Sequence, residues 1–248
     1  MKRLYLLVVF ALFFALIANS AMAITSAEIL SKVKTAESKL NDVKAEMVIT
    51  SANKGNVMDL GEGYSEILNL QKGVISYKKP DKLRMDGFAQ GIKASFIQNG
   101  YKKLVLASMI RKTEDLKDKP GKRLDTLDFG FLSSRLWVDN TVSITSTDKS
   151  GTVQLKFVPK TGGQSKRHDR VWMDPKTLRI IKREKYRGSG EMRVRYIYSA
   201  HKNMAGNLPI ATTSTLYNTA GEKLGTVTYK SVQHNVGLAD SLFSLTQR

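Results

Sequence analysis

The sequence contains no cysteine, which excludes disulfide bonds, thiolate metal sites and cysteine nucleophiles. Its three histidines, His168, His201 and His234, are too far apart in the chain to form a short metal-binding pair. The GxSxG, GxGxxG and P-loop motifs are also missing. The sequence leaves open a glycosidase that uses paired carboxylates, because any two acids can meet in a fold. Most acids of this chain, however, lie in charged loops or turns. We therefore expect no enzyme, no catalytic residue, no metal and no cofactor.

Long apolar runs are absent after the first residues of the chain. Lys2 and Arg3 precede an apolar run over residues 4–18, and Ala21-Met22-Ala23 follows as a small-x-small cleavage site. The run is shorter than the roughly 20 residues of a membrane span, so an uncleaved anchor is the weaker reading. We predict a signal peptide over residues 1–23 and one mature domain over residues 24–248, located in the periplasm. No cysteine at the cleavage point could carry a lipid anchor.

Acidic residues are few: 22 against 40 lysines and arginines, which gives a formal net charge of +18. In an exported protein this excess favours anionic lipid head groups or an acidic protein partner over nucleic acid. One basic cluster lies at Lys166, Arg167, His168 and Arg170. We predict that a second group forms a docking face for a membrane or a transport partner: Lys182, Arg183, Lys185, Arg187, Arg193 and Arg195. A basic surface that simply stays solvated is the alternative.

The mature chain begins with the pattern of an amphipathic helix. Thr25 and Glu28 form a capping box, and Ile29, Val33 and Ala36 follow on one face. From residue 43 onward the apolar period changes to two, with short turns such as Asn99-Gly100. This pattern predicts one domain, mainly β with a few helices, built on a strongly curved antiparallel sheet. We hypothesise that one interior is lined by Ile92, Phe96, Val153, Phe157, Val194 and Tyr196.

The middle of the chain interrupts the β pattern. Residues 111–123 are rich in charge and are expected to form a solvated loop. Residues 124–136, which we name the lid segment, carry apolar side chains at helical spacing and a glycine in the middle: Leu124, Leu127, Gly130, Phe131, Leu132 and Leu136. Because glycine weakens a helix, Gly130 is expected to act as a joint in a short helical lid.

Three segments resemble the family of outer-membrane lipoprotein-sorting proteins, the LolA-like periplasmic carriers. They are GVISYKKPDKLRM at residues 73–85, VWMDPKTLRIIKRE at residues 171–184 and NVGLADSLFSL at residues 235–245. The resemblance implies a half-open β-barrel, covered by an N-terminal helix and a helical lid, around a hydrophobic cavity for acyl chains. Arg84 matches the arginine that is functional in the carriers, which implies a role in closing the lid and releasing the ligand.

The resemblance also implies the function. We expect a soluble, monomeric periplasmic carrier that shields acyl chains of lipoproteins or lipids and delivers them toward the outer membrane. Its partners would be the lipoprotein or lipid cargo, membrane-associated donor and acceptor proteins, and transiently the anionic membrane surface. The alternative is an RseB-like sensor that binds lipid or misfolded protein, because one fold can serve both functions.

Overall fold

The computed structural model describes residues 24–52, 70–89, 91–162 and 166–247. The predicted signal peptide and a strand expected at residues 64–70 lie outside the described residues, apart from Leu70. The first half of the chain forms α2 (Ser26–Glu37), β1 (Asp42–Ala52), β2 (Leu70–Lys78), β3 (Lys82–Ala89), β4 (Ile92–Asn99), β5 (Lys102–Ala107) and β6 (Ile110–Asp115). The short helices η2 (Pro120–Lys122), η3 (Thr126–Phe129) and α5 (Arg135–Asp139) follow.

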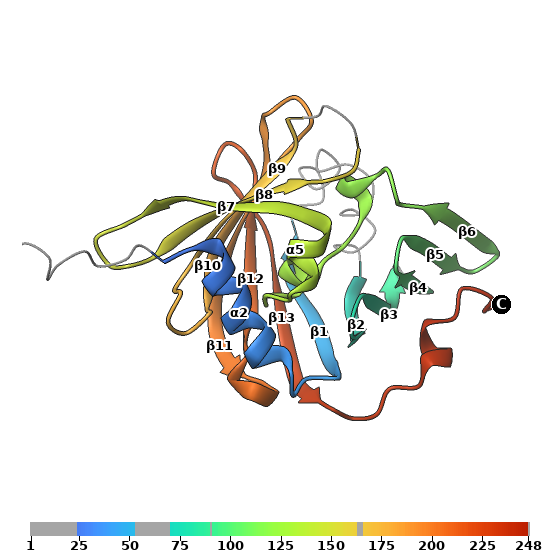
Figure 1. The fold of residues 1–248 in the computed structure, drawn as a ribbon. Helices are drawn as coiled ribbons and strands as arrows, with labels where there is room; N and C mark the ends of the chain where they lie inside the picture. The colour runs from blue at the N-terminus through green and yellow to red at the C-terminus, as the bar shows by residue number, and fades with distance from the viewer. Residues whose placement is uncertain (1–23, 53–69, 90, 163–165, 248) are drawn as a thin grey trace, which may run out of the picture.

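The second half returns to strands (Figure 1). It forms β7 (Asn140–Thr147), β8 (Val153–Pro159), β9 (His168–Met173), β10 (Ile180–Tyr186), β11 (Met192–Asn203), η4 (Ala205–Asn207), β12 (Pro209–Tyr217), β13 (Lys223–His234) and η5 (Asp240–Phe243).

The described strands make one antiparallel sheet in the order β6-β5-β4-β3-β2-β1-β13-β12-β11-β10-β9-β8-β7. The chain enters at the centre with β1, runs outward strand by strand to the edge strand β6, and resumes at the opposite edge with β7. It then returns inward until β13 pairs with β1. The sheet is strongly curved and unclosed, and its two edge strands are consecutive in sequence (Figure 1). The predicted fold class is confirmed.

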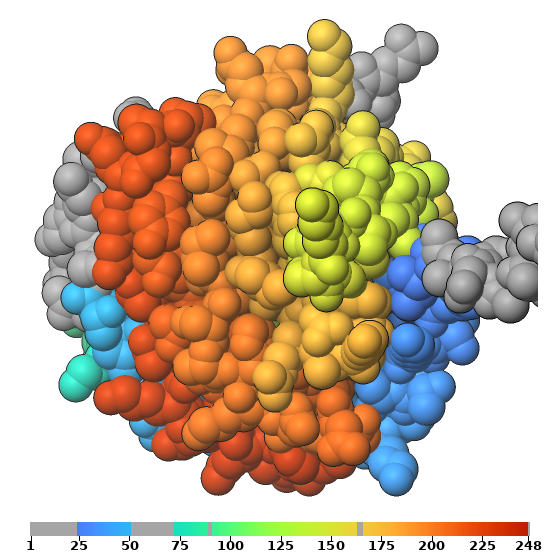
Figure 2. Space-filling model, turned by 90° about the vertical axis from the view of Figure 1, so that its left-hand side faces the viewer, coloured from blue at the N-terminus to red at the C-terminus, as the bar shows by residue number. Residues whose placement is uncertain are grey.

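Helix α2 covers part of the concave face. Its capping box is present, since the Glu28 amide donates to the Thr25 hydroxyl and the Glu28 carboxylate accepts from the Thr25 amide. Ile29 and Val33 are fully buried in the main core. The helix approaches η4 so closely that a Cβ atom on Gly206 would lie 1.9 Å from the carbonyl oxygen of Ala36. The convex outer surface of β11–β13 is continuous (Figure 2).

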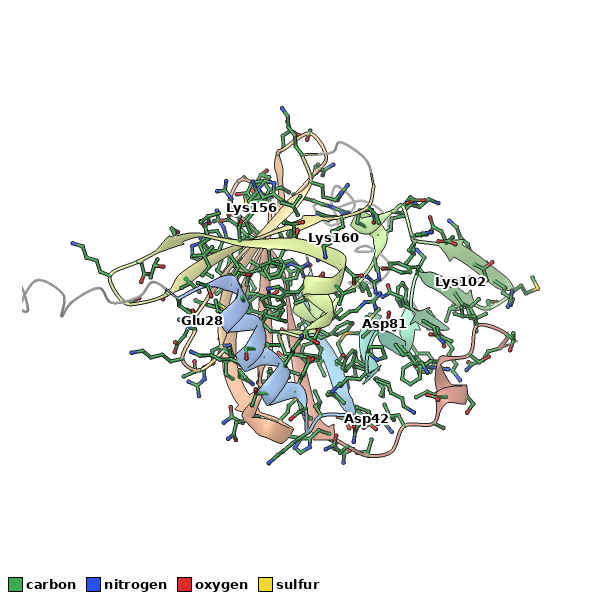
Figure 3. The ribbon with its side chains drawn as sticks, viewed as in Figure 1. Glu28, Asp42, Asp81, Lys102, Lys156 and Lys160 are labelled. Atoms are coloured by element: carbon green, nitrogen blue, oxygen red, sulfur yellow. The ribbon has the colours of Figure 1, made fainter. Side chains whose placement is uncertain are left out.

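A separate small core lies on the convex side of β4 and β5. Ile97 and Leu104 are fully buried there against Phe243 of the C-terminal segment. The Asp42 carboxylate holds this segment near its start by accepting the amides of residues 236–238 (Figure 3). The two faces of the antiparallel sheet are therefore covered by different parts of the chain: α2 packs on the concave face, and the C-terminal segment packs on the convex face.

Arg84 belongs to this outer side and not to the lid. It forms a two-pronged ion pair with Asp86 and donates to the carbonyl of Leu242 and the side chain of Gln247. Strand alternation explains the difference, because Leu83 and Met85 on either side of it point into the core. In this structure the guanidinium anchors the C-terminal segment, so the lid-closing role implied for Arg84 stays a prediction that these contacts do not support.

The charged stretch before the lid segment also differs from expectation. Its first part forms the edge strand β6, which pairs with β5 along its whole length. Its side chains are almost all exposed, so no apolar alternation marks the strand in the sequence.

We expect Gly206→Ala to destabilise the protein by about 3 kcal/mol, because the new methyl group would collide with the end of α2 and the backbone has a φ of 71°. Gly221→Ala is the matched control: its φ is 82°, and nothing lies within 4 Å of the added Cβ. Urea unfolding compares the two. Equal losses would mean that the contact between α2 and η4 does not constrain the fold.

Candidate functional site

The connection between the two edge strands crosses the open side of the curved sheet and includes the lid segment (Figure 1). Its apolar side chains point inward and belong to the main core. They are Leu124, Leu127, Phe129, Phe131, Leu132 and Leu136, all 7% exposed or less. In this structure the lid segment therefore fills the interior that the sheet encloses.

Hydrogen bonds fasten the lid segment to strands on both halves of the sheet. Gln98 of β4 exchanges two bonds with the backbone of Leu124, at 2.9 and 3.0 Å. The Tyr198 hydroxyl donates to the carbonyl of Leu127 at 2.7 Å, and the Ala211 amide donates to the carbonyl of Gly130 at 2.8 Å. These bonds satisfy backbone groups that would otherwise be buried alone.

Gly130 caps η3 in the left-handed conformation, with a φ of 86°. A Cβ atom there would lie 2.6 Å from the carbonyl oxygen of Ala211. The segment is two short helices around a tight turn, so Gly130 separates the helices as expected but is itself packed against β12. An alanine would break this contact and not merely stiffen a joint.

A buried ion cluster joins the lid segment to β9 and β10. The side chain of Arg183 is 1% exposed. Its guanidinium bonds to Asp125 at 2.8 Å, Asp128 at 3.0 Å and Asp169 at 2.7 Å. Lys185 also reaches Asp128, at 3.3 Å. Two acids of the lid segment and Asp169 of β9 thus share two cations of β10.

Burial and charge act differently on the two acids of the lid segment: burial raises the pKa of Asp125 despite the nearby Arg183 and Lys185. Asp125 caps η3, and Asp128 completes a capping box with it, so both carboxylates are oriented by the helix itself. Burial raises the pKa of Asp128, but Lys185 and Arg183 outweigh burial and hold that pKa below its ordinary value. Burial alone would lower the pKa of Arg183, whereas its three acidic partners raise it well above the ordinary value.

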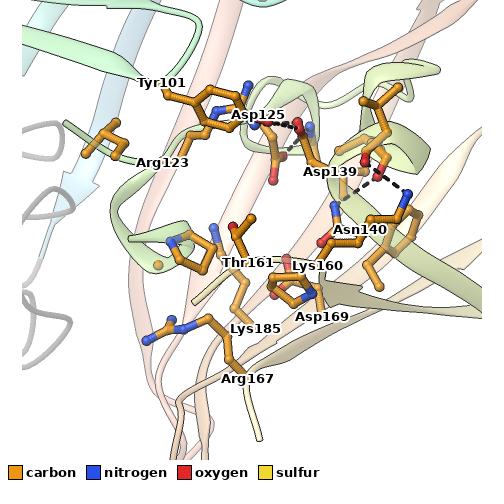
Figure 4. Close-up of a pocket in the computed structure, with 18 of the residues that line it drawn as sticks. Tyr101, Arg123, Asp125, Asp139, Asn140, Lys160, Thr161, Arg167, Asp169 and Lys185 are labelled. Atoms are coloured by element: carbon orange, nitrogen blue, oxygen red, sulfur yellow. Dashed lines mark hydrogen bonds and ion pairs between the residues drawn. The ribbon is translucent and has the colours of Figure 1, made fainter. Parts of the chain in front are cut away.

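A second cluster holds the outer end of the connection. Arg123 pairs with Asp139 and with Asp81 of the turn between β2 and β3, and it stacks 4.7 Å from the Tyr101 ring (Figure 4). Arg135 pairs with the same two acids. Beside them is a cavity of about 110 Å³ with mixed polar and apolar walls, including Phe157, Lys160 and Arg167.

The apolar cavity of the interior is smaller, about 40 Å³, and lies under the lid segment. It is lined by Met47, Met85, Leu124, Asp128, Phe129, Tyr196, Ser214, Leu216, Val227 and Tyr229. Among the described residues the buried hydroxyl of Ser214 finds no hydrogen-bond partner. Asp128 therefore lines the inner cavity and is also a member of the ion cluster.

The predicted cavity residues only partly meet there. Phe96, Val153, Phe157, Val194 and Tyr196 are buried in the main core, but only Tyr196 lines the inner cavity. Ile92 is 50% exposed at the end of its strand and does not line it. Met85 alternates with polar neighbours in β3, and Met47 does so imperfectly in β1, but alternation alone does not show which inward residues border an empty volume.

The predicted docking face is divided between two sides of β10. Arg183 and Lys185 point inward to the lid segment, which removes them from any outer surface. Lys182 and Arg195 pair with Glu184 on the other side. Arg187 is exposed, and Arg193 is half-buried. Because side chains alternate between the two faces of a strand, residues 182–187 cannot all lie on one outer face.

No family model and no curated protein matches the sequence. Solved structures do match its fold. A LolA superfamily protein from Nitrosomonas europaea has a TM-score of 0.58 and 15% identity, over 90% of this chain and 98% of that one. An outer membrane lipoprotein-sorting protein domain from Vibrio parahaemolyticus has a TM-score of 0.53 and 13% identity, over 86% of this chain and 95% of that one.

A DUF1329 family protein from Desulfovibrio piger is similar at a TM-score of 0.52 and 10% identity, over 88% of this chain and 95% of that one. The chain therefore has a LolA-like fold, which confirms the resemblance at the level of the fold. Within the described residues, no helix is long and apolar enough to cross a bilayer.

We expect Asp128→Asn to destabilise the protein by about 3 kcal/mol at pH 7, because it removes a buried carboxylate that both Arg183 and Lys185 contact. Since the folded pKa of Asp128 is lowered, its contribution is fully present above the unfolded pKa of about 4 and is lost as the pH falls through the folded pKa. The difference from wild type should therefore shrink in acid. Urea unfolding at pH 7 and pH 3 measures it.

Asp118→Asn, at an exposed acid of the same connection, is the control. An equal loss in the two variants at pH 7 would contradict a special role for the Asp128 cluster.

Proposed function

We propose that this protein is a periplasmic carrier that shields acyl chains of a lipoprotein or lipid and hands them on without a chemical step. The observation that carries the proposal is that the interior of the curved sheet is filled by a separate, ion-latched lid segment and not by the sheet's own side chains alone. The LolA-like fold supports it. Export through the signal peptide at residues 1–23 belongs to the same proposal.

Magnitudes favour exchange between the lid segment and an acyl chain. Burying one methylene stabilises by about 0.8 kcal/mol, so a chain of about 15 methylenes gains about 12 kcal/mol. Withdrawing Leu127, Phe129 and Phe131 from the interior would cost about 5 to 9 kcal/mol at about 1.5–3 kcal/mol each. An acyl chain can thus replace several lid side chains, while the ion cluster sets a threshold that small apolar molecules do not reach.

The latch explains how release would be driven. When the ligand leaves, Asp125 and Asp128 return to Arg183 and the lid side chains refill the interior. The closed form is then stable by itself, and no nucleotide or redox cofactor is needed. No feature of the described residues points specifically to a sensor, and the sensor stays the alternative prediction.

We expect protein isolated from periplasm to carry lipid that mass spectrometry of an organic extract detects. Val227→Trp should reduce this lipid content and the affinity for a fluorescent fatty acid by about tenfold, because the indole would fill the inner cavity. Val236→Trp, on the exposed C-terminal segment, is the control. Circular dichroism checks that both variants are folded.

A wild-type extract free of lipid, together with no binding of the fatty acid, would refute the carrier. Undiminished binding by a folded Val227→Trp variant would place the ligand elsewhere than in the inner cavity.

A further inference from the structure

Most of the large apolar side chains that the described residues expose lie at the ends of two neighbouring hairpins. Of seven such side chains, four lie at the ends of two hairpins: Phe88 is 57% exposed, Ile92 50%, Met109 98% and Ile110 65%. We name this group the hairpin-end patch. The β3–β4 turn supplies the first two and the β5–β6 turn the other two.

The strand register places the two turns side by side. Ala89 pairs with Ile92 across β3 and β4, and Ala94 pairs with Ala107 across β4 and β5. Ala107 pairs in turn with Ile110 of β6. The turn at residues 108–109 therefore lies next to Ile92, at the side of the molecule away from α2 (Figure 1).

The exposure of Met109 contributes nothing to folding. Ser108 and Met109 form a two-residue hairpin turn, and Ser108 has a φ of 49°, a conformation for which glycine, asparagine or aspartate is preferred. A polar turn residue would serve the hairpin at least as well as a methionine that touches almost nothing. A cluster of such side chains marks an interaction surface.

Charge indicates the kind of partner. Residues 87–94 and 105–113 contain Lys93, Arg111 and Lys112 but no acid. Lys93 and Lys112 are exposed, whereas Arg111 donates to the carbonyl of Leu245 and helps to fix the C-terminal segment. Apolar side chains flanked by cations match an anionic bilayer, which offers a negative surface over an apolar interior.

The patch is also connected to the interior of the sheet. Ile92, Ala107 and Ile110 lie on the same face as Ala94, Phe96 and Val105, since they are direct cross-strand partners or alternate along one strand. Phe96 is buried in the main core, and Ala94 and Val105 are half-buried against it. The concave face thus runs from Ile92 and Ile110 to the core, whereas Phe88, the cross-strand partner of Lys93, lies on the other face of the sheet.

We propose that the hairpin-end patch is a membrane-contact surface that inserts Met109, Ile110, Ile92 and Phe88 into the outer layer of an anionic bilayer. Lys93 and Lys112 bind the lipid phosphates around it. The proposal names the membrane-facing surface of the carrier proposed above, but it concerns a different set of residues from the inner cavity.

Vesicle co-sedimentation tests the surface with liposomes of phosphatidylcholine alone or mixed with phosphatidylglycerol. Wild-type binding should rise with the anionic fraction and fall with salt. Met109→Ser/Ile110→Ser should weaken binding to the mixed vesicles by at least about tenfold, because two large side chains no longer enter the bilayer. Ile181→Ser/Val236→Ser removes two exposed apolar side chains elsewhere and should bind like wild type.

Insertion has a readout of its own. The indole of a Met109→Trp variant should shift its emission to the blue on anionic vesicles and be quenched by brominated acyl chains. Lys93→Gln/Lys112→Gln should bind more weakly and lose part of the salt dependence. An unshifted indole, or equal binding by the two serine double variants, would overturn the proposal and leave a protein partner as the occupant of the patch.

Lipid content and vesicle binding distinguish a failure of this proposal from a failure of the carrier proposal. The Met109→Ser/Ile110→Ser protein should retain its co-purified lipid, since neither side chain lines the inner cavity. Vesicle binding through the patch by a protein that carries no lipid would refute only the carrier, and lipid content without vesicle binding would refute only the membrane contact.

Discussion

The buried guanidinium of Arg183 is the interaction on which the closed arrangement of the molecule depends. It connects Asp125 and Asp128 of the lid segment with Asp169 of β9, in a place almost sealed from water. A charge in such a place is tolerated only when it is paired, so a partial withdrawal of the lid segment is more costly than either end state. If the lid segment opens as proposed, the cluster would therefore favour two states, fully closed and fully open. Because Asp128 also lines the inner cavity, whatever enters that cavity acts directly on one member of the latch.

The topology explains why a lid exists at all. The two edge strands β6 and β7 are consecutive in sequence but lie at opposite ends of the sheet, so the chain between them must cross the open side. That crossing lies over an apolar concave face, which only apolar side chains such as Leu127 and Phe131 can cover. The same residues that complete the core in the closed state are thus the ones that a ligand would replace. The apolar side chains of the lid segment are therefore part of the core in the closed state.

Much of the fold could be predicted from the sequence because period-two alternation and capping residues act locally. Thr25 and Glu28 predicted the start of α2, and the alternation in β8 and β11 predicted the burial of Phe157 and Tyr196. The site could not be predicted in the same way, since Arg183 acquires its partners from segments 14 to 58 residues away. A basic stretch such as residues 182–187 gives no sign of which cations turn inward until the register of the strand is known. The position of Arg84 depends on register in the same way, because its neighbours Leu83 and Met85 point inward and its own side chain points outward.

Strand β3 shows how one element serves two independent tasks. Leu83 and Met85 face the interior, where the lid segment packs, while Arg84 and Asp86 face outward to the C-terminal segment. That segment is held by Asp42, Lys82 and Arg111 as well, all of them residues of β1–β6. None of these bonds involves the lid segment, so an opening of the lid segment would leave the contacts between the C-terminal segment and β1–β6 intact. Under the two functions proposed above, the hairpin ends of this braced half would keep one position on a membrane while the interior exchanges its ligand, so that docking and ligand exchange use separate parts of one sheet.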